Sequence, residues 1–266
     1  MQIQDKVVVV TGAASGIGRG LARRFALEGA RAVVAVDYDE AGARALVDEL
    51  AADPATAGVA TSARRADVSV EADLVAVIDG TEADHGPIDL FCSNAGILAI
   101  GGPELPDDEW RRILDVNVMA HVYAARHLVP RMLERGDGYL LNTCSAAGLL
   151  TQIGSAPYSV TKHAAVGFAE WLAVTYGDRG LKVSALCPQA VESKMTVGVE
   201  GGGVAGVDGM LTPAQVAEAV VEGLADERFL ILPHPEVADY FRRKASDYDR
   251  WIAGMRRLQA RFGIEM

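Results

Sequence analysis

Short apolar runs alternate along the chain with longer stretches of helical periodicity. The runs predicted to form strands are residues 7–10, 32–36, 59–65, 88–92, 139–143, 181–186 and 229–232, of which 7–10 and 32–36 are predicted to be buried and 59–65 is a weaker strand. The stretches predicted to form helices between them are residues 18–28, 40–52, 70–84, 107–135, 155–178 and 212–224. Strands that are apolar on both faces and separated by helices are typical of a parallel sheet covered on both sides. The pattern therefore predicts a doubly wound α/β fold with a seven-stranded parallel sheet.

Two segments depart from this rhythm. Residues 197–209 contain six glycines, which predicts a mobile loop. Residues 235–263 form an amphipathic, Arg-rich stretch in which Trp251, Met255 and Leu258 repeat at helical spacing. Such a stripe is usually a packing face, which here could cover a neighbouring subunit or close a substrate cleft. Because no linker or repeat is visible, we expect one domain over residues 1–266, with a core of 1–234 and a C-terminal helical extension of 235–266.

Composition removes several function classes. Half of the 266 residues are apolar and 23% are charged, which is typical of a globular protein. The net charge of −11 argues against a nucleic-acid partner, because such binding normally needs a basic patch. No run approaches the roughly 18 apolar residues of a membrane span, and residues 1–6 lack a secretory apolar core. Three cysteines in apolar stretches, without a CxxC pair, favour reduced thiols and a cytoplasmic protein. The five histidines show no metal-ligand spacing, so no metal is expected.

A glycine-rich turn joins the first strand to the first helix. It contains Gly12, Gly16 and Gly18 within the sequence TGAASGIG. The glycines permit a tight turn and close backbone approach to a pyrophosphate, and the helix N-terminus offers free N–H groups and a positive dipole end. In this context the turn predicts a dinucleotide site on a Rossmann-type sheet, and the alternative is a purely structural turn.

An acidic residue at the end of the second strand bears on which dinucleotide binds. Asp37 lies about 20 residues beyond the last glycine, where a carboxylate accepts hydrogen bonds from the adenosine ribose hydroxyls and repels a 2′-phosphate. Tyr38 follows it, where an NADP enzyme more often has Arg, and Ser15 is also uncharged. These residues favour NAD, whereas Arg19 is a nearby cation that would favour NADP. The alternative for Asp37 is a helix cap or a solvated acid.

With these residues in place, the chain resembles the short-chain dehydrogenase/reductase family over most of residues 5–195. The turn has the family's TGxxxGxG form. Further matches are Asp67-Val68, Asn94-Ala95-Gly96, Asn117, Ser145 placed 13 residues before Tyr158, and the YxxxK motif from Tyr158 to Lys162. The resemblance implies cofactor contacts at Gly12, Ser15, Gly16, Ile17, Gly18, Asp37, Asp67, Val68, Asn94, Ala95, Gly96, Tyr158, Lys162, Pro188, Val191 and Ser193.

The resemblance also implies a catalytic set of Asn117, Ser145, Tyr158 and Lys162. Tyr158 and Lys162 are four residues apart, so they share a helix face, and a nearby ammonium stabilises a phenolate. Tyr158 would then exchange a proton with an alcohol or ketone. Lys162 would also bind the nicotinamide ribose, Ser145 would hydrogen-bond the substrate oxygen, and Asn117 would support a water linked to Lys162. Taken singly, these residues could also be a surface pair, a strand-end serine and an internally satisfied amide.

Two departures from the family pattern concern the cofactor pocket. Ser93 replaces the first Asn of the usual NNAG segment. After the sixth strand, Gln189 stands where glycine is usual, and Val191 and Ser193 replace the usual hydrophobic residue and Thr. Thr196 is a second candidate for the contact with the nicotinamide amide.

The segments that form the family's substrate pocket indicate the substrate class. Residues 97–100, residues 146–153 and Met195 with the Gly-rich loop are mostly apolar and contain no Arg or Lys pair. We therefore expect an uncharged, fairly hydrophobic secondary alcohol or its ketone, although Leu149, Leu150 and Ile153 could simply pack the core. The Gly-rich loop could act as a lid.

The main hypothesis is an NAD-dependent oxidoreductase, an alcohol dehydrogenase acting on a small-molecule CH–OH group. The alternatives are an NADPH-dependent ketone reductase and a non-catalytic dinucleotide-binding protein. By resemblance the chain forms a homodimer or homotetramer through the helices at 107–135 and 155–178.

Overall fold

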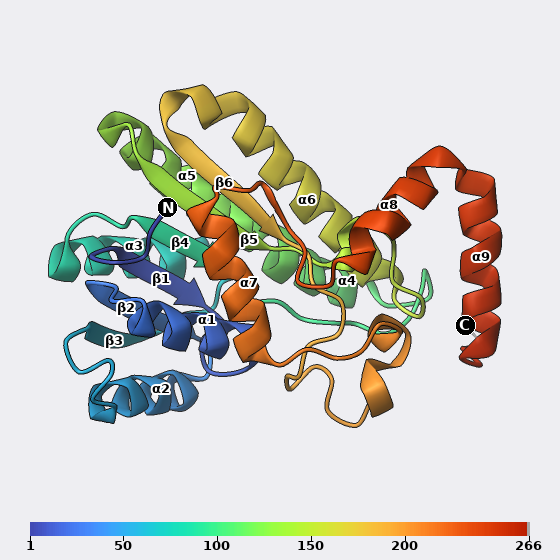
Figure 1. The fold of residues 1–266 in the computed structure, drawn as a ribbon, viewed down its shortest axis with the longest axis horizontal. Coiled ribbons are helices and arrows are strands. Elements are labelled where there is room, and N and C mark those ends of the chain that lie inside the picture. Colours follow the sequence, from blue (N-terminus) through green and yellow to red (C-terminus); the bar gives the residue numbers. More distant parts are fainter. Residues whose placement is uncertain (265–266) are drawn as a thin grey trace.

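The computed structural model describes residues 1–264 and shows one α/β unit built on a seven-stranded sheet. All neighbouring strands are parallel, in the order β3-β2-β1-β4-β5-β6-β7 (Figure 1). The strands are β1 Val7–Thr11, β2 Ala32–Asp37, β3 Ala60–Arg65, β4 Leu90–Ser93, β5 Gly138–Thr143, β6 Leu181–Leu186 and β7 Leu230–Ile231. The prediction of a doubly wound, Rossmann-type parallel sheet is confirmed. Because the strand order reverses between β1 and β4, the crevice for a ligand is expected at the carboxyl ends of these strands.

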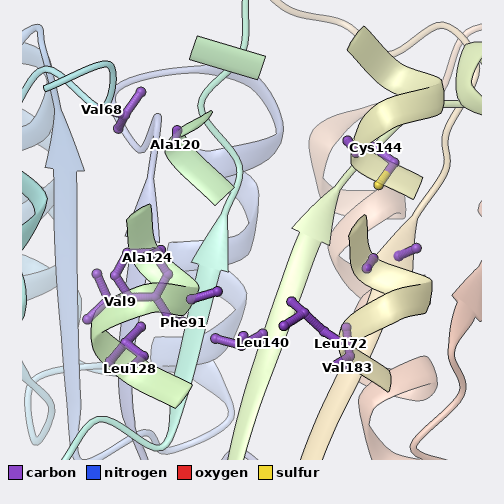
Figure 2. Close-up of a cluster of buried hydrophobic side chains, with 14 of the residues drawn as sticks. Val9, Val68, Phe91, Ala120, Ala124, Leu128, Leu140, Cys144, Leu172 and Val183 are labelled. Atoms are coloured by element: carbon purple, nitrogen blue, oxygen red, sulfur yellow. The ribbon is translucent and has the colours of Figure 1, made fainter. Parts of the chain in front are cut away.

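Helices cover both faces of the sheet. They are α1 Gly16–Leu27, α2 Glu40–Ala52, α3 Glu71–His85, α4 Asp107–Leu114, α5 Ala120–Arg135, α6 Ala156–Tyr176, α7 Pro213–Ala225, α8 Glu236–Ser246 and α9 Tyr248–Arg261. One apolar core lies between the sheet and α3, α5 and α6, and the other lies between the sheet and α1, α2 and α7. Figure 2 shows part of the first, where Phe91 of β4 and Leu140 of β5 lie close to Leu128 of α5 and Leu172 of α6.

The helix predicted over residues 107–135 is not a regular α-helix throughout. α4 and α5 are joined by a π-helical turn, Asp115–Met119, with Asn117 in its middle. One extra residue per turn at this point is typical of a functional distortion rather than of sequence propensity. The tail after β7 is helical and consists of two helices, because Asp247 adopts an extended conformation (φ −154°) and separates α8 from α9.

Other local predictions are confirmed. Thr212 caps α7 in a capping box with Gln215, as its sequence indicated. Cys92, Cys144 and Cys187 are free and buried. Within residues 1–264, no helix is long and apolar enough to cross a membrane.

Candidate active site

A large cavity opens at the carboxyl ends of the parallel strands. Its volume is about 1810 Å³, well above the roughly 300–1,000 Å³ of a pocket for one ligand. All the predicted site residues line it except Asn117 and Gly18. The sequence therefore identified residues from several strand ends that the fold brings to one cavity with room for a dinucleotide and a second molecule.

The glycine turn forms one wall of this cavity. Gly12 and Gly16 have positive φ (+69° and +52°), a conformation that L-residues with a Cβ rarely adopt. A Cβ on Gly18 would lie 2.2 Å from the carbonyl oxygen of Gly12, so Gly18 closes the turn from behind. α1 begins at Gly16, and the N–H groups of its first turn have no partner within the helix. This cradle fits the pyrophosphate of a dinucleotide.

Asp37, which the sequence analysis expects at the adenosine end of a dinucleotide, lines the cavity. Its two carboxylate oxygens accept from the backbone N–H groups of Ala14 and Asp39, both at 2.9 Å. Each oxygen retains a lone pair, so the carboxylate can still accept from ribose hydroxyls. Arg19 does not line the cavity, and its guanidinium forms an ion pair with Glu49. Arg65 does not line the cavity either, but it is paired in register with Asp37, and its guanidinium lies 4.9 Å from the centroid of the ring of Tyr38, which does line the cavity.

Asn94 joins three strand ends beneath the cavity. Its Nδ2 donates to the carbonyl of Thr11 at 3.0 Å, and its Oδ1 accepts from Thr143 Oγ1 at 3.0 Å. The following Gly96 is close to the predicted catalytic lysine, since a Cβ there would lie 3.5 Å from Lys162 Nζ. The Asn94-Ala95-Gly96 turn thus connects the strand that precedes the glycine turn to the side chains predicted to be catalytic.

The predicted catalytic residues on the cavity wall lie just after β5 and on α6. Lys162 is only 2% exposed, and its Nζ donates to the carbonyl of Thr143 at 3.0 Å and lies 5.5 Å from the centroid of the Tyr158 ring. Ser145 is also buried, and its Oγ accepts from the N–H of Ala147 at 3.0 Å. A buried amine beside a cavity-lining phenol is not the surface pair that a Tyr and Lys four residues apart usually form.

Asn117 lies behind the cavity wall. Its Oδ1 accepts from the N–H of Ile97 at 2.9 Å, and its Nδ2 donates to the carbonyl of Ile97 at 3.0 Å and to Thr161 Oγ1 at 3.2 Å. These bonds use its amide to fix the turn that carries Gly96. They also give a physical reason for the π-helical turn, which positions this amide toward the backbone of Ile97.

Gln189, in the segment after β6, stands where the family usually has glycine, and its side chain contacts the Gly-rich loop. Its Nε2 donates to Asp208 Oδ2 at 3.0 Å, so the side chain ties this segment to the Gly-rich loop. The same loop comes close at Gly202 (φ +79°), where a Cβ would lie 2.5 Å from the Cβ of Ala190. Ser193 and Thr196 both line the cavity, and the hydroxyl of Thr196 accepts from the N–H of Ser193 at 3.0 Å.

His121 is a buried titratable group near this site that the sequence analysis did not single out. Its Nδ1 lies 3.2 Å from Asn142 Oδ1, and it is 2% exposed. Burial, with a smaller contribution from the charge of Lys162, lowers the pKa of His121 to about 4. The imidazole is therefore neutral at pH 7 and adds no positive charge beside Lys162.

The substrate side of the cavity differs from the expectation in one respect. Leu150 and Ile153 line the cavity, as the sequence analysis expected. Leu149 does not, so of these three residues it alone only packs in the core. Trp251, Met255 and Leu258 of α9 also line it. The expectation of a pocket without paired cations is wrong, because the cavity is also lined by Arg112, Arg243, Arg250, Arg257 and Arg261. The available signal was the spacing of Arg250, Arg257 and Arg261, which places them on one face of a helix.

No group of three or more His, Cys, Asp or Glu residues in the described part of the chain is arranged to hold a metal ion.

Comparison with known proteins places this geometry in context. A family model described as short chain dehydrogenase matches residues 6–201. The chain is 36% identical over 259 residues to a 1-deoxy-11-beta-hydroxypentalenate dehydrogenase from Streptomyces exfoliatus, covering 95% of this chain and 92% of the relative. A short-chain dehydrogenase/reductase from Burkholderia phymatum, solved in complex with NAD, superposes with a TM-score of 0.84 at 31% identity, covering 94% and 96% of the two chains. A short-chain dehydrogenase from Sphingobium yanoikuyae, solved in complex with NADPH, superposes with a TM-score of 0.78 at 27% identity, covering 92% and 93%.

The family model spans more than half of the chain, and it contains the glycine turn, Asn117, Ser145, Tyr158 and Lys162. The protein belongs to the short-chain dehydrogenase/reductase family.

Proposed function

We propose that the protein is an NAD(H)-dependent oxidoreductase that interconverts a secondary alcohol and its ketone, with Tyr158 as the general acid and base. The observation that carries the proposal is the gathering of Tyr158, Lys162 and Ser145 on a cavity that also contains the dinucleotide cradle. A non-catalytic dinucleotide-binding protein would have no need for a buried lysine beside this tyrosine.

In this proposal Tyr158, Lys162 and Ser145 have different roles at the substrate oxygen. Tyr158 donates a proton to the forming alkoxide in reduction and removes it from the alcohol in oxidation. The carbonyl of Thr143 holds Lys162 Nζ at 3.0 Å, and this amine lies 5.5 Å from the centroid of the Tyr158 ring, beside the phenol that exchanges the proton. Ser145 Oγ accepts from the N–H of Ala147 at 3.0 Å, and its hydroxyl donates to the carbonyl of Pro188 only at a long 3.5 Å, a weak bond that a substrate oxygen can replace. A bound nicotinamide dinucleotide supplies or accepts the hydride.

Asn117 is a positioning residue in this proposal. Its amide is engaged by Ile97 and Thr161, so it acts on Lys162 by fixing the turn that packs against the lysine head group. The water-holding role that the resemblance implies needs a further partner for the same amide oxygen, which has a second lone pair.

The choice of NAD rests on Asp37. A carboxylate at the adenosine end favours ribose hydroxyls over a 2′-phosphate. NADPH-dependent reduction is the second candidate, favoured by the proximity of Arg65 to Tyr38 and supported by the NADPH complex of the Sphingobium protein.

The substrate is a small molecule with a largely apolar body, because Leu150, Ile153 and Trp251 line the cavity. The Streptomyces relative is named for a hydroxylated acid, and at 36% identity that name does not determine the charge of this chain's substrate. The proposal also includes a cytoplasmic homodimer or homotetramer in which α5 and α6 form the interface.

The test separates proton transfer from binding. Tyr158→Phe is expected to abolish alcohol oxidation and ketone reduction while NADH still binds with a near wild-type Kd, measured by fluorescence titration. Tyr176→Phe on the same helix is the control, because Tyr176 does not line the cavity. Full activity of Tyr158→Phe would contradict the assigned proton transfer, and failure of the wild type to bind either NADH or NADPH would contradict the redox function.

A further inference from the structure

The helix α9 presents two parallel stripes of side chains to the cavity. Arg250, Arg257 and Arg261 form one stripe, and Trp251, Met255, Leu258 and Phe262 form the other. Residues seven and eleven positions apart lie on one face of an α-helix, and a rise of about 1.5 Å per residue makes the arginine row about 16 Å long. Arg256, which belongs to the same helix, does not line the cavity. The arginines of this row therefore lie on the face of α9 that is turned toward the cavity, and Arg256 lies on another face.

The tail is held over the substrate side of the cavity. Lys244 of α8 is buried, and its Nζ donates to the carbonyl of Leu149 at 2.7 Å. At the other end of α9, Ile264 approaches Gly154, where a Cβ would lie 3.6 Å from its side chain. Both contacts are made with the segment that follows Ser145, and Figure 1 shows α9 at the end of the molecule away from β3 and α2. The arginine row thus faces the substrate side rather than the glycine turn.

Within residues 1–264 the arginine row forms no ion pair, as is also true of Arg31, Arg65, Arg179, Arg243 and Arg256. Arg19, Arg24 and Arg131, in contrast, each form ion pairs with carboxylates.

Charge is also divided unevenly along the cavity. The acidic residues Asp37 and Asp67 line the cofactor side. On the tail side the acidic lining residue is Asp247, whose carboxylate accepts from the N–H of Arg250 as the N-cap of α9. Residues 235–264 contain seven Lys or Arg and four Asp or Glu, in a chain whose net charge is −11. A basic surface in an acidic protein, facing the substrate side of a cavity, is complementary to an anion.

We infer that α9 binds an anionic group of the substrate, a carboxylate or a phosphate, and that the rest of this substrate is apolar. The apolar stripe contacts that body, and Arg250, Arg257 and Arg261 bind the anion while the reacting oxygen lies at Tyr158. The inference rests on the proposed function, and it replaces an uncharged substrate with a hydrophobic hydroxy or keto anion. Arginine suits this role because its planar guanidinium binds carboxylate and phosphate in a bidentate manner.

The expected effect is moderate, because these arginines are exposed. Single exposed ion pairs are weak and are screened by salt, whereas several cations along one face act together. We expect the anionic form of a suitable substrate to be preferred over its neutral form by about tenfold in kcat/KM at low ionic strength. The preference should fall as salt is added.

The experiment uses a homologous series of methyl ketones with increasing numbers of methylenes between the ketone and the terminal group. Each chain length is tested as the carboxylate, as the phosphate monoester and as the neutral methyl ester, with NADH and the full chain. The readouts are kcat/KM and, independently of turnover, the Kd of each compound for the enzyme–NADH complex by calorimetry. The carboxylate and phosphate arms distinguish the two sources of charge.

Two variants make the test specific to the arginine row. Arg250→Gln/Arg257→Gln is expected to remove the preference for the anion over the ester, and Arg256→Gln is expected to retain it. Both should fold, because none of the residues Tyr248–Arg261 is buried. Equal Kd values for anion and ester at every length, or an equal loss of preference in the Arg256→Gln control, would overturn the inference. If no compound is reduced but the anion still binds more tightly through Arg250 and Arg257, the proposed function fails while the anion site stands.

Discussion

Asn117 and Ile97 are joined by two hydrogen bonds that run in opposite directions. The N–H of Ile97 donates to Asn117 Oδ1 at 2.9 Å, and Asn117 Nδ2 donates to the carbonyl of Ile97 at 3.0 Å. The side-chain amide of Asn117 therefore makes the two hydrogen bonds to Ile97, in the turn after β4, that a neighbouring strand would make in a sheet. Because Asn117 is fully buried, both backbone groups of Ile97 depend on it in place of water.

This pairing predicts a stability cost for Asn117→Ala. An unsatisfied buried polar group costs about 1–3 kcal/mol, so we expect the free energy of unfolding to fall by about 2–4 kcal/mol, measured by urea denaturation. Thr161→Val removes only the weaker partner of the same amide and should cost less. An unchanged urea midpoint for Asn117→Ala would show that the turn does not depend on this side chain.

The sequence predicted the sheet because its signals are local. Runs such as residues 7–10 are apolar at every position, as expected for a strand buried on both faces. The glycine turn was equally accessible, since positive φ at Gly12 and Gly16 requires glycine whatever the surroundings.

The features that the sequence did not predict depend on contacts between distant segments. The π-helical turn at Asn117 is tied to the backbone of Ile97, 20 residues earlier in the chain. Arg19, which is close in sequence to the glycine turn and was the reservation about NAD, forms an ion pair with Glu49 of α2. The arginines of α9 were visible in the sequence, but only the anchoring of α8 through Lys244 shows that they face the cavity.

Exposed apolar residues on α6 predict an effect on assembly. Val174 is 87% exposed and Trp171 is 54% exposed, on the helix proposed to form an interface between subunits. A charge at the centre of an apolar interface has a large desolvation cost, so Val174→Glu is expected to shift the protein toward monomers in sedimentation velocity. Leu27→Glu, at an exposed apolar position of α1, is the control and should leave the mass unchanged. An identical mass for both variants would place the interface elsewhere.

Burial of His121 predicts a loss of stability in acid. Its pKa is about 4 in the folded protein and about 6.5 when unfolded, so between these values the unfolded chain binds more protons. Its contribution to stability is present above pH 6.5 and is lost as the pH falls toward 4, by about 2 kcal/mol between pH 7 and pH 5.

The variant His121→Gln has no titrating side chain at this position. Its free energy of unfolding should therefore fall by about 2 kcal/mol less than that of the wild type between pH 7 and pH 5. The pKa of His234 is also lowered, mainly by burial, and its contribution cancels because both proteins contain it. Parallel pH dependences of the two proteins would mean that His121 is protonated in the folded state.

Asp37 and Arg65 together predict a change of cofactor preference. In Asp37→Ala the repulsion of a 2′-phosphate is removed, and the guanidinium on Tyr38, paired in register with this position, is free to bind the phosphate. We expect the ratio of the NADPH and NADH dissociation constants, measured by fluorescence titration, to shift toward NADPH by about tenfold, which corresponds to about 1.4 kcal/mol. The ratio is the proper measure, because Asp37 also accepts from the backbone of Ala14 and Asp39 and its loss weakens both complexes alike.

Adding Arg65→Gln should reverse the shift, whereas Arg19→Gln should leave it in place because the guanidinium of Arg19 forms an ion pair with Glu49. An unchanged ratio in Asp37→Ala would mean that the carboxylate does not discriminate between the two dinucleotides, and reversal by Arg19→Gln alone would assign the phosphate to that cation instead.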